Sequence, residues 1–190
     1  MDQRTARKQL GLPENIRIGL LFGSIDRRKG VLAILDIMRQ ASQPIDDFLL
    51  LIAGPVSPAI QEELHTRISE LRSRWKIELR DQYIEQDMSA YYSSADCVIS
   101  TYINFTTSSS VVVHAACCGK PSLVSPEGAM EDTIRQWEIG AVANLNRPGE
   151  YLATLEALLN MPETERLALE QRAKSFADTM KAHRFMDQFR

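Results

Sequence analysis

Short, wholly apolar runs alternate along the chain with longer segments in which apolar residues recur every three or four positions. The short runs predict buried β-strands. The clearest run is 48–53, six consecutive apolar residues that end at Gly54-Pro55, a pattern typical of a parallel strand covered on both faces. By the same criteria we predict strands at residues 16–22, 48–53, 75–80, 96–101, 121–125 and 141–143. Apolar and charged residues alternate in 75–80, which places that strand nearer an edge of the sheet.

The longer segments predict helices, and residues 29–41, for example, carry their apolar side chains on one stripe. We predict helices at 29–41, 58–74, 88–95 and 108–118, and helical structure from about residue 149 onward, where Pro162 suits the start of a second helix. Gly119 suits the end of the helix at 108–118. Strands that alternate with helices predict an α/β fold, a parallel sheet of about six strands with helices on both faces. Residues 1–15 look like a connector to this domain, which we place at 16–190.

Composition excludes several classes of protein. The chain has 190 residues, the size of one domain. Lys and Arg (22) against Asp and Glu (25) give a net charge of −3, so we expect no nucleic-acid partner. No apolar run approaches the roughly 18 residues that span a bilayer, and the N-terminus lacks a signal-peptide core, so we expect no transmembrane segment. Three cysteines are too few for a disulfide scaffold, and we expect a reducing, cytoplasmic setting.

Ligands of open α/β sheets bind beyond the carboxyl ends of the strands, and the loop over residues 23–30 is the first candidate there. Gly23 and Gly30 permit tight turns. Lys29 stands at the predicted helix start, where a cation is unfavourable with the helix dipole unless an anion binds beside it. The alternative is a solvated basic turn. The loop is neither a Walker loop nor G-x-G-x-x-G, so neither of those mechanisms is supported.

The second candidate loop holds five consecutive hydroxyl residues before a predicted helix, namely Thr106, Thr107, Ser108, Ser109 and Ser110. Such a run offers helix caps and free backbone N–H groups, at which a phosphate could dock. Simple N-capping, which needs only one of the five, is the alternative.

The third candidate loop, residues 125–133, contains Glu131 and Asp132. These carboxylates could contact sugar hydroxyls or cap the next helix, and the sequence alone favours capping. His114 is a single helical histidine, which is more often structural or exposed than catalytic. The chain has neither a zinc-ligand spacing nor a Ser-His-Asp order, so we expect no metal site.

Five segments resemble, in order and spacing, the motifs of GT-B glycosyltransferases of the family 4 type, the group 1 glycosyl transferases. Residues 23–30 resemble the loop G-R-x(4)-K-G, 50–54 the strand L-x-I-x-G, 88–98 the segment L-x-x-Y-Y-x-x-A-D-V-x-V, 114–121 the signature E-A-M-A-C-G-K-P-V, and 127–132 the motif x-G-G-x-x-E. The resemblance covers nearly the whole chain. It implies a Rossmann-like three-layer α/β/α domain, the C-terminal, donor-binding half of a GT-B fold, whose N-terminal acceptor domain is missing or belongs to a partner chain.

The resemblance also assigns roles to residues. Lys29 matches the family lysine that neutralises the donor diphosphate as the glycosidic bond breaks, and is the expected catalytic residue. Ser24 stands where the family has an arginine, for which Arg27 or Arg28 could compensate. Thr106 and His114 replace the two glutamates of the family's E-x(7)-E motif; histidine can still hydrogen-bond a hydroxyl, but threonine supplies no charge. The other expected donor-binding residues are Gly23, Ser24, Arg28, Thr107, Ser108, Ser109, Ser110 and Glu131.

Taken with the residues, the resemblance predicts the donor-binding half of a retaining, hexosyltransferase-like enzyme, which we expect to be inactive without an acceptor domain. Its donor substrate would be a nucleotide diphosphate sugar, with no cofactor, and its acceptor is unknown. Peripheral membrane association through the missing domain is compatible with this hypothesis. The alternative is a degenerate, non-catalytic module for nucleotide or protein binding, because both motif glutamates and the arginine are absent. A flavodoxin-like or receiver domain would need an acidic cluster after the first strand, where Asp26 is the only acid.

Overall fold

The computed structural model describes residues 1–82 and 87–187. The described residues form one six-stranded sheet in the order β3-β2-β1-β4-β5-β6, in which every pairing is parallel. The strands are β1 (Arg17–Phe22), β2 (Phe48–Ala53), β3 (Lys76–Arg80), β4 (Cys97–Ser100), β5 (Ser122–Val124) and β6 (Gly140–Val142). The predicted Rossmann-like α/β fold is therefore confirmed, with β3 at an edge as the alternating pattern indicated.

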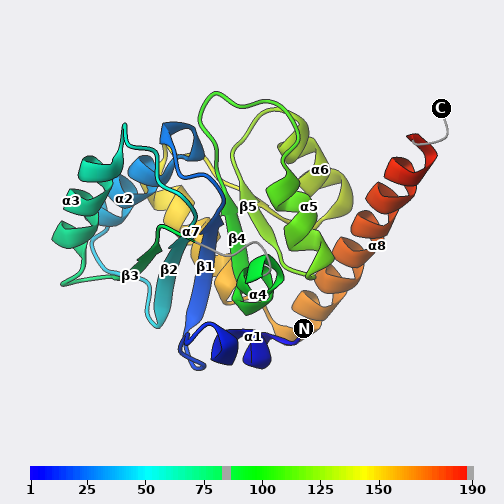
Figure 1. Cartoon of the computed structure of the whole chain (residues 1–190), viewed down its shortest axis with the longest axis horizontal. Coiled ribbons are helices and arrows are strands. Elements are labelled where there is room, and N and C mark those ends of the chain that lie inside the picture. Colours follow the sequence, from blue (N-terminus) through cyan, green and yellow to red (C-terminus); the bar gives the residue numbers. More distant parts are fainter. Residues whose placement is uncertain (83–86, 188–190) are drawn as a thin grey trace.

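Helices cover both faces of the sheet (Figure 1). They are α1 (Gln3–Gln9), α2 (Val31–Gln40), α3 (Gln61–Leu71), α4 (Met88–Ser94), α5 (Ser110–Cys117), α6 (Ala129–Trp137), α7 (Pro148–Leu159) and α8 (Glu163–Asp187), with a 3-10 turn, η1 (Arg27–Lys29), before α2. The core on one face joins the sheet to α2, α3 and α7. On the other face, α4 and α5 cover the centre, while α6 and α8 pack with α5 over β5.

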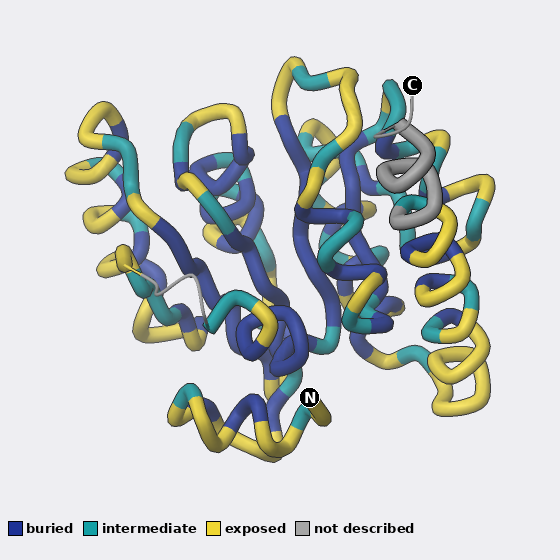
Figure 2. The backbone as a smooth tube through the Cα atoms, turned by 45° about the vertical axis from the view of Figure 1, so that its right-hand side comes forward, coloured by how far each residue is buried: buried dark blue, intermediate teal, exposed yellow. Residues whose placement is uncertain are grey.

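The side-chain alternation of the central strands explains why their sequences are wholly apolar. In β2, Leu50 and Ile52 belong to the core under α2 and α3, whereas Leu49 and Leu51 belong to the core under α4 and α5. Neighbouring residues of a strand point to opposite faces, so a strand that is covered twice needs apolar residues at every position. Figure 2 shows the central strands buried and the exposed residues gathered on the outer sides of helices and loops.

Helix boundaries differ from the predicted ones at the carboxyl edge of the sheet. The segment 29–41 is not one helix, because Gly30 has φ +70° and separates η1 from α2. Lys29 therefore ends a 3-10 turn rather than opening a helix, which corrects the sequence-based prediction. Helix α5 begins at Ser110, with Ser109 as its N-cap, and Gly119 follows its C-cap with φ +68°, as its sequence position indicated.

The segment 1–15, expected to be a connector, contains helix α1, which the sequence pattern does not predict. Helix α1 packs against α4, and Arg7 anchors it. The Arg7 guanidinium lies 2.7 Å from the carboxylate of Asp96, and their side chains are only 6% and 17% exposed. It also donates hydrogen bonds to the carbonyls of Ser94 and Glu14. Since the anchor is a buried ion pair, α1 lacks the apolar stripe by which helices are recognised.

None of the helices within the described residues is long and apolar enough to span a membrane. The longest is α8, of 25 residues. It buries Ala173, Phe176 and Ala177 against α5 and α6. These three residues thus serve the core of the domain.

Two glycines hold the ends of β1 and β2 in close contact. Gly23 donates its N–H to the carbonyl of Ala53 at 3.0 Å. Gly54 has φ +142°, and a Cβ atom there would lie 2.0 Å from the carbonyl oxygen of Gly23. A side chain at position 54 would therefore displace the loop that follows β1.

We expect Gly54→Ala to lower the free energy of unfolding by about 3 kcal/mol, because the new methyl group would clash with the backbone of Gly23, which can shift only by displacing the loop after β1. Gly149→Ala is the matched control, since Gly149 lies in the first turn of α7 and a Cβ added there would meet no atom within 4 Å. That change should be neutral or stabilising by about 0.5–1 kcal/mol. Chemical denaturation of both variants measures the difference, and equal stabilities would contradict the expectation.

Candidate functional site

The loops after β1, β4 and β5 meet at the carboxyl edge of the sheet. The strand order reverses between β1 and β4; α2, the helix that follows β1, packs on one face and α5, the helix that follows β4, on the other. Loops that diverge in this way open the crevice in which α/β sheets bind ligands. Backbone contacts join the loops, because Ile103 donates to the carbonyl of Arg28 at 2.8 Å and Ala129 to that of Thr106 at 2.9 Å.

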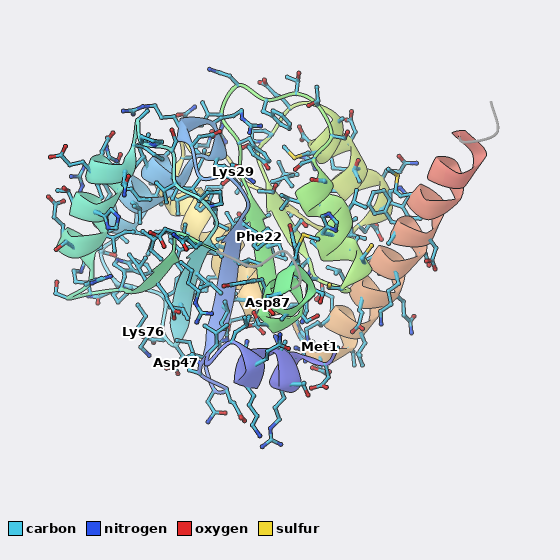
Figure 3. The ribbon with its side chains drawn as sticks, viewed as in Figure 1. Met1, Phe22, Lys29, Asp47, Lys76 and Asp87 are labelled. Atoms are coloured by element: carbon cyan, nitrogen blue, oxygen red, sulfur yellow. The ribbon has the colours of Figure 1, made fainter. Side chains whose placement is uncertain are left out.

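Lys29 lies at this edge, beside the end of β1. Its ammonium donates to the carbonyl of Phe22, the last residue of β1, and to the hydroxyl of Tyr102, both at 2.7 Å. The residue is only 6% exposed, and Asp26 caps its turn by accepting from the Lys29 backbone N–H at 3.1 Å. Figure 3 shows Lys29 and Phe22 toward the upper end of β1, with Lys76 and Asp47 at the opposite, amino edge. The charge is therefore buried and hydrogen-bonded rather than solvated.

Tyr102 links this charge to the first turn of α5. Its hydroxyl lies 3.1 Å from that of Ser109, and Ser109 Oγ accepts from the backbone N–H of Val111 at 3.3 Å. Burial acts to raise the pKa of Tyr102, but the charge and hydrogen bond of Lys29, with hydroxyl contacts, outweigh it and lower the pKa. The lysine, the phenol and the amino end of α5 form one hydrogen-bonded chain.

The two arginines of the first loop point to different places. The Arg28 guanidinium lies 5.3 Å from the ring centroid of Tyr102 and 5.1 Å from that of Phe105. Arg27 instead pairs with Glu63 of α3 at 2.9 Å. Arg28 is thus the arginine that lies on Tyr102, the residue whose hydroxyl binds Lys29. Ser24 is exposed in the same loop, and a Cβ at Gly23 would lie 3.4 Å from the ammonium of Lys29.

Of the five hydroxyl residues, Ser109 alone forms the side-chain cap of α5 within the described chain. The side chains of the other four face solvent; they are Thr106, Thr107, Ser108 and Ser110. The cap accounts for one hydroxyl, as the capping alternative requires, and the structure brings the exposed four to the same edge as Lys29.

His114 lies on α5, half-buried and turned toward α4. Its ring is 5.6 Å from that of Tyr92, which in turn is 5.0 Å from the ring of Phe22. This row of rings runs along the covered face of the sheet to the end of β1. Tyr92 therefore separates His114 from Phe22 at the end of β1.

Glu131 makes a contact at the start of its helix. Its carboxylate accepts from the backbone N–H of Glu127, which precedes α6, and pairs with Arg135 at 2.7 Å. The hydrogen bond from Glu127, followed by that from Arg135, lowers the pKa of Glu131. The N-cap of α6 is Gly128 and makes no side-chain cap hydrogen bond. Glu131 therefore ties the residue before the N-cap to the first turn, rather than capping the helix as the sequence favoured.

Sequence reasoning missed two aromatic residues of the site, Tyr102 and Phe105. Their rings lie 4.6 Å apart, and Tyr102 also lines a pocket of about 230 Å³ at the ends of β4, β5 and β6. The other lining residues are Ala33, Ile103, Asn104, Ser125, Pro126, Glu127, Asn144, Leu145 and Asn146. The available signal was an aromatic residue directly after a strand that ends at the ligand-binding edge.

Metal-ligating side chains do not gather at this edge. Across residues 1–82 and 87–187, no group of three or more His, Cys, Asp or Glu side chains could hold a metal ion. The chemistry visible at the site is that of cations, hydroxyl groups and backbone amides.

Comparison with known proteins adds a second line of observation. The family described as "Glycosyl transferases group 1" matches residues 2–176. The D-inositol 3-phosphate glycosyltransferase of Mycolicibacterium vanbaalenii is 26% identical over 93% of this chain, and the chain spans 41% of that relative. The D-inositol 3-phosphate glycosyltransferase 1 of Catenulispora acidiphila is 25% identical over 85% of this chain, which spans 40% of it.

Solved structures share the fold. Sucrose-phosphate synthase from Thermosynechococcus elongatus superposes with a TM-score of 0.78 at 22% identity, covering 99% of this chain and 49% of that one. The Anabaena protein HepE, in complex with UDP and glucose, superposes with a TM-score of 0.72 at 21% identity, covering 92% of this chain and 47% of that one. The similarity extends over about half of each neighbour.

Glu131→Gln is expected to lower stability by about 0.5–1 kcal/mol at pH 7, because the amino end of α6 loses its carboxylate. A pKa that is lower in the folded chain adds stability above the unfolded value of 4.5, and this stability is lost as pH falls through the folded pKa. The difference from the wild type should therefore disappear in acid. Denaturation at several pH values measures it, with Glu156→Gln on exposed α7 surface as the control; a difference that persists in acid would contradict the cause.

Proposed function

This chain belongs to the group 1 glycosyl transferases, and on that basis we propose that it is the donor-binding half of an enzyme that transfers a sugar from a nucleotide diphosphate sugar. The observation that carries the proposal is the arrangement at the carboxyl edge, where Lys29, Arg28 and the amino end of α5 are linked through Tyr102. The HepE structure in complex with UDP supports it, since its fold is similar.

A diphosphate fits this crevice on electrostatic grounds. The buried Lys29 ammonium acts in surroundings of lower dielectric than water, so its attraction for an anion is screened less. The amino end of α5 adds partial positive charge and backbone N–H groups. Lysine has three N–H donors, and the two hydrogen bonds to Phe22 and Tyr102 leave one for a ligand.

Catalysis in this proposal is electrostatic. When the glycosidic bond breaks, negative charge builds on the departing nucleotide diphosphate, and groups positioned before the reaction stabilise it without reorganising. Lys29 and Arg28 supply the charge, and residues 107–110 supply the amide and hydroxyl donors. Thr106 stands at the position nearest the transferred sugar and has no charge. In this proposal the rate acceleration therefore comes from stabilising the charge on the departing diphosphate. We propose transfer with retention at the anomeric carbon.

The acceptor must come from outside the described domain. The chain spans 41% of the mycobacterial relative, and we propose that an N-terminal domain or a partner chain presents the acceptor nucleophile across the crevice. The 190-residue chain would then bind the donor without transferring the sugar.

Ribose recognition is the weaker part of the site. His114 replaces the glutamate that holds the ribose hydroxyls in related sequences, and it is half-buried beside Tyr92. We therefore propose that the diphosphate supplies most of the binding energy. The comparisons do not favour the alternative of a non-catalytic module.

We expect UDP or GDP to raise the melting temperature of the chain, because a ligand that binds only the folded state stabilises it. At about 100 Kd, linkage gives about 2.7 kcal/mol, or a rise of roughly 5–10 °C for a chain of this size. Lys29→Met, which keeps side-chain volume, should remove the rise. Thermal unfolding with and without nucleotide measures it.

Lys76→Ala is the matched control, because Lys76 is exposed at the amino edge of the sheet. This variant should keep the wild-type rise in melting temperature. No rise in the wild type with either nucleotide at millimolar concentration would reject the donor-binding function and favour the non-catalytic alternative.

A further inference from the structure

Tyr102 contacts Lys29, Arg28 and Ser109, three groups from two different loops at the carboxyl edge. Its hydroxyl binds the Lys29 ammonium at 2.7 Å and the Ser109 hydroxyl at 3.1 Å. Its ring lies under the Arg28 guanidinium at 5.3 Å and beside the Phe105 ring at 4.6 Å. The family motifs in this sequence assign no role to either aromatic residue.

We propose that Tyr102 and Phe105 are the positioning residues of the diphosphate site. The Tyr102 hydroxyl connects the Lys29 ammonium to Ser109 at the amino end of α5. The rings of Tyr102 and Phe105 hold the Arg28 guanidinium against their faces. Arg28 thereby takes the place of the arginine that Ser24 replaces. This inference rests on the proposed function, since it names the residues that assemble the same site.

The hydrogen-bond inventory supports the role of the Tyr102 hydroxyl. Lysine and a backbone N–H can only donate hydrogen bonds. Lys29 therefore donates to the Tyr102 hydroxyl and Val111 donates to the Ser109 hydroxyl, at the two ends of the Tyr102–Ser109 pair. The pair needs only one hydroxyl proton between its two oxygens. The other proton is available to an acceptor outside the pair, as is the third N–H of Lys29. Phosphate oxygens are acceptors of this kind.

The contrast between neighbouring arginines supports the role of the rings. Arg28 is 45% exposed at its side chain and stacks on two aromatic faces, whereas Arg27 is drawn to Glu63. Stacking uses the face of the guanidinium and leaves its N–H edge for hydrogen bonds. One nitrogen of that edge pairs with the Asp26 carboxylate at 3.5 Å, and the same carboxylate caps the turn of Lys29.

A purely structural role would look different from a positioning role. Tyr102→Phe keeps the ring and removes only the hydroxyl. Arg28 therefore keeps its contact with the ring, while the Lys29 ammonium loses one hydrogen-bond partner. Phe105→Leu keeps the bulk and removes one aromatic face from Arg28. Neither change removes a charge, and each should affect anion binding through a different cation.

The test measures the affinity of the chain for inorganic pyrophosphate and for UDP by calorimetry. We expect Tyr102→Phe to weaken pyrophosphate binding about tenfold, the loss typical of a hydrogen bond to a charged group. In the Lys29→Met background the same change should have little further effect, because the partner is already gone. Phe105→Leu should weaken binding about threefold, and should have little further effect in the Arg28→Ala background.

Two control variants match these changes. Tyr151→Phe removes another buried tyrosine hydroxyl, which lies 3.1 Å from that of Thr101, the residue before Tyr102. Tyr151 packs under α2 on the other face of the sheet, so this change should lower stability without changing affinity. Arg27→Ala removes the neighbouring positive charge and should leave pyrophosphate affinity within about twofold of the wild type.

The outcomes separate this inference from the proposed function. If Lys29→Met weakens binding while Tyr102→Phe binds pyrophosphate as well as the wild type, or more tightly, the positioning role is overturned and the donor site stands. Effects that add fully in the double variants would also overturn it. If the wild type binds neither pyrophosphate nor UDP nor GDP at millimolar concentration, both the positioning role and the donor-binding function are rejected.

Discussion

A buried ammonium group between β1 and β4 is the constraint on which the rest of the site depends. An uncompensated charge in a protein interior is costly, so its partners must be present whenever the chain is folded. The carbonyl of Phe22 and the hydroxyl of Tyr102 meet that requirement for Lys29. Both partners come from the ends of strands, which the sheet register fixes. The core of the sheet therefore determines where the loops at the carboxyl edge lie.

The fold could be predicted because its physical signals are local. The run 48–53 is apolar at every position since the strand is covered twice, and the alternation in 75–80 marks an edge. Helix α1 escaped prediction because a buried ion pair between Arg7 and Asp96 holds it, and such a pair has no periodic signature. The break at Gly30 could be suspected from the glycine, but its φ of +70° depends on how η1 closes against β4.

The candidate site was predictable in its place and only partly in its members. Strand ends and glycines predict which loops meet, so Lys29 and the hydroxyl run could be named from the sequence. The directions of Arg27 and Arg28 could not, because they depend on Glu63 of α3 and on two rings from the loop after β4. Glu131 also departs from the expected cap, because its carboxylate accepts from Glu127, the residue before the N-cap Gly128.

The absence of the motif glutamates and the presence of Tyr102 both affect how much positive charge remains around Lys29 and Arg28. A crevice that holds a glutamate near the transferred sugar places a negative charge close to its lysine and arginine. Here Thr106 leaves that charge out. The Lys29 ammonium is held by neutral partners, a carbonyl and a phenol, while Arg28 lies on two aromatic faces and pairs with Asp26 at 3.5 Å. Neutral partners neutralise less of the positive charge than a carboxylate does, so more of it remains to attract a diphosphate. Under the proposed donor-binding function, a site assembled in this way would favour the leaving group over the sugar, the order of recognition that we also propose from His114 and Thr106.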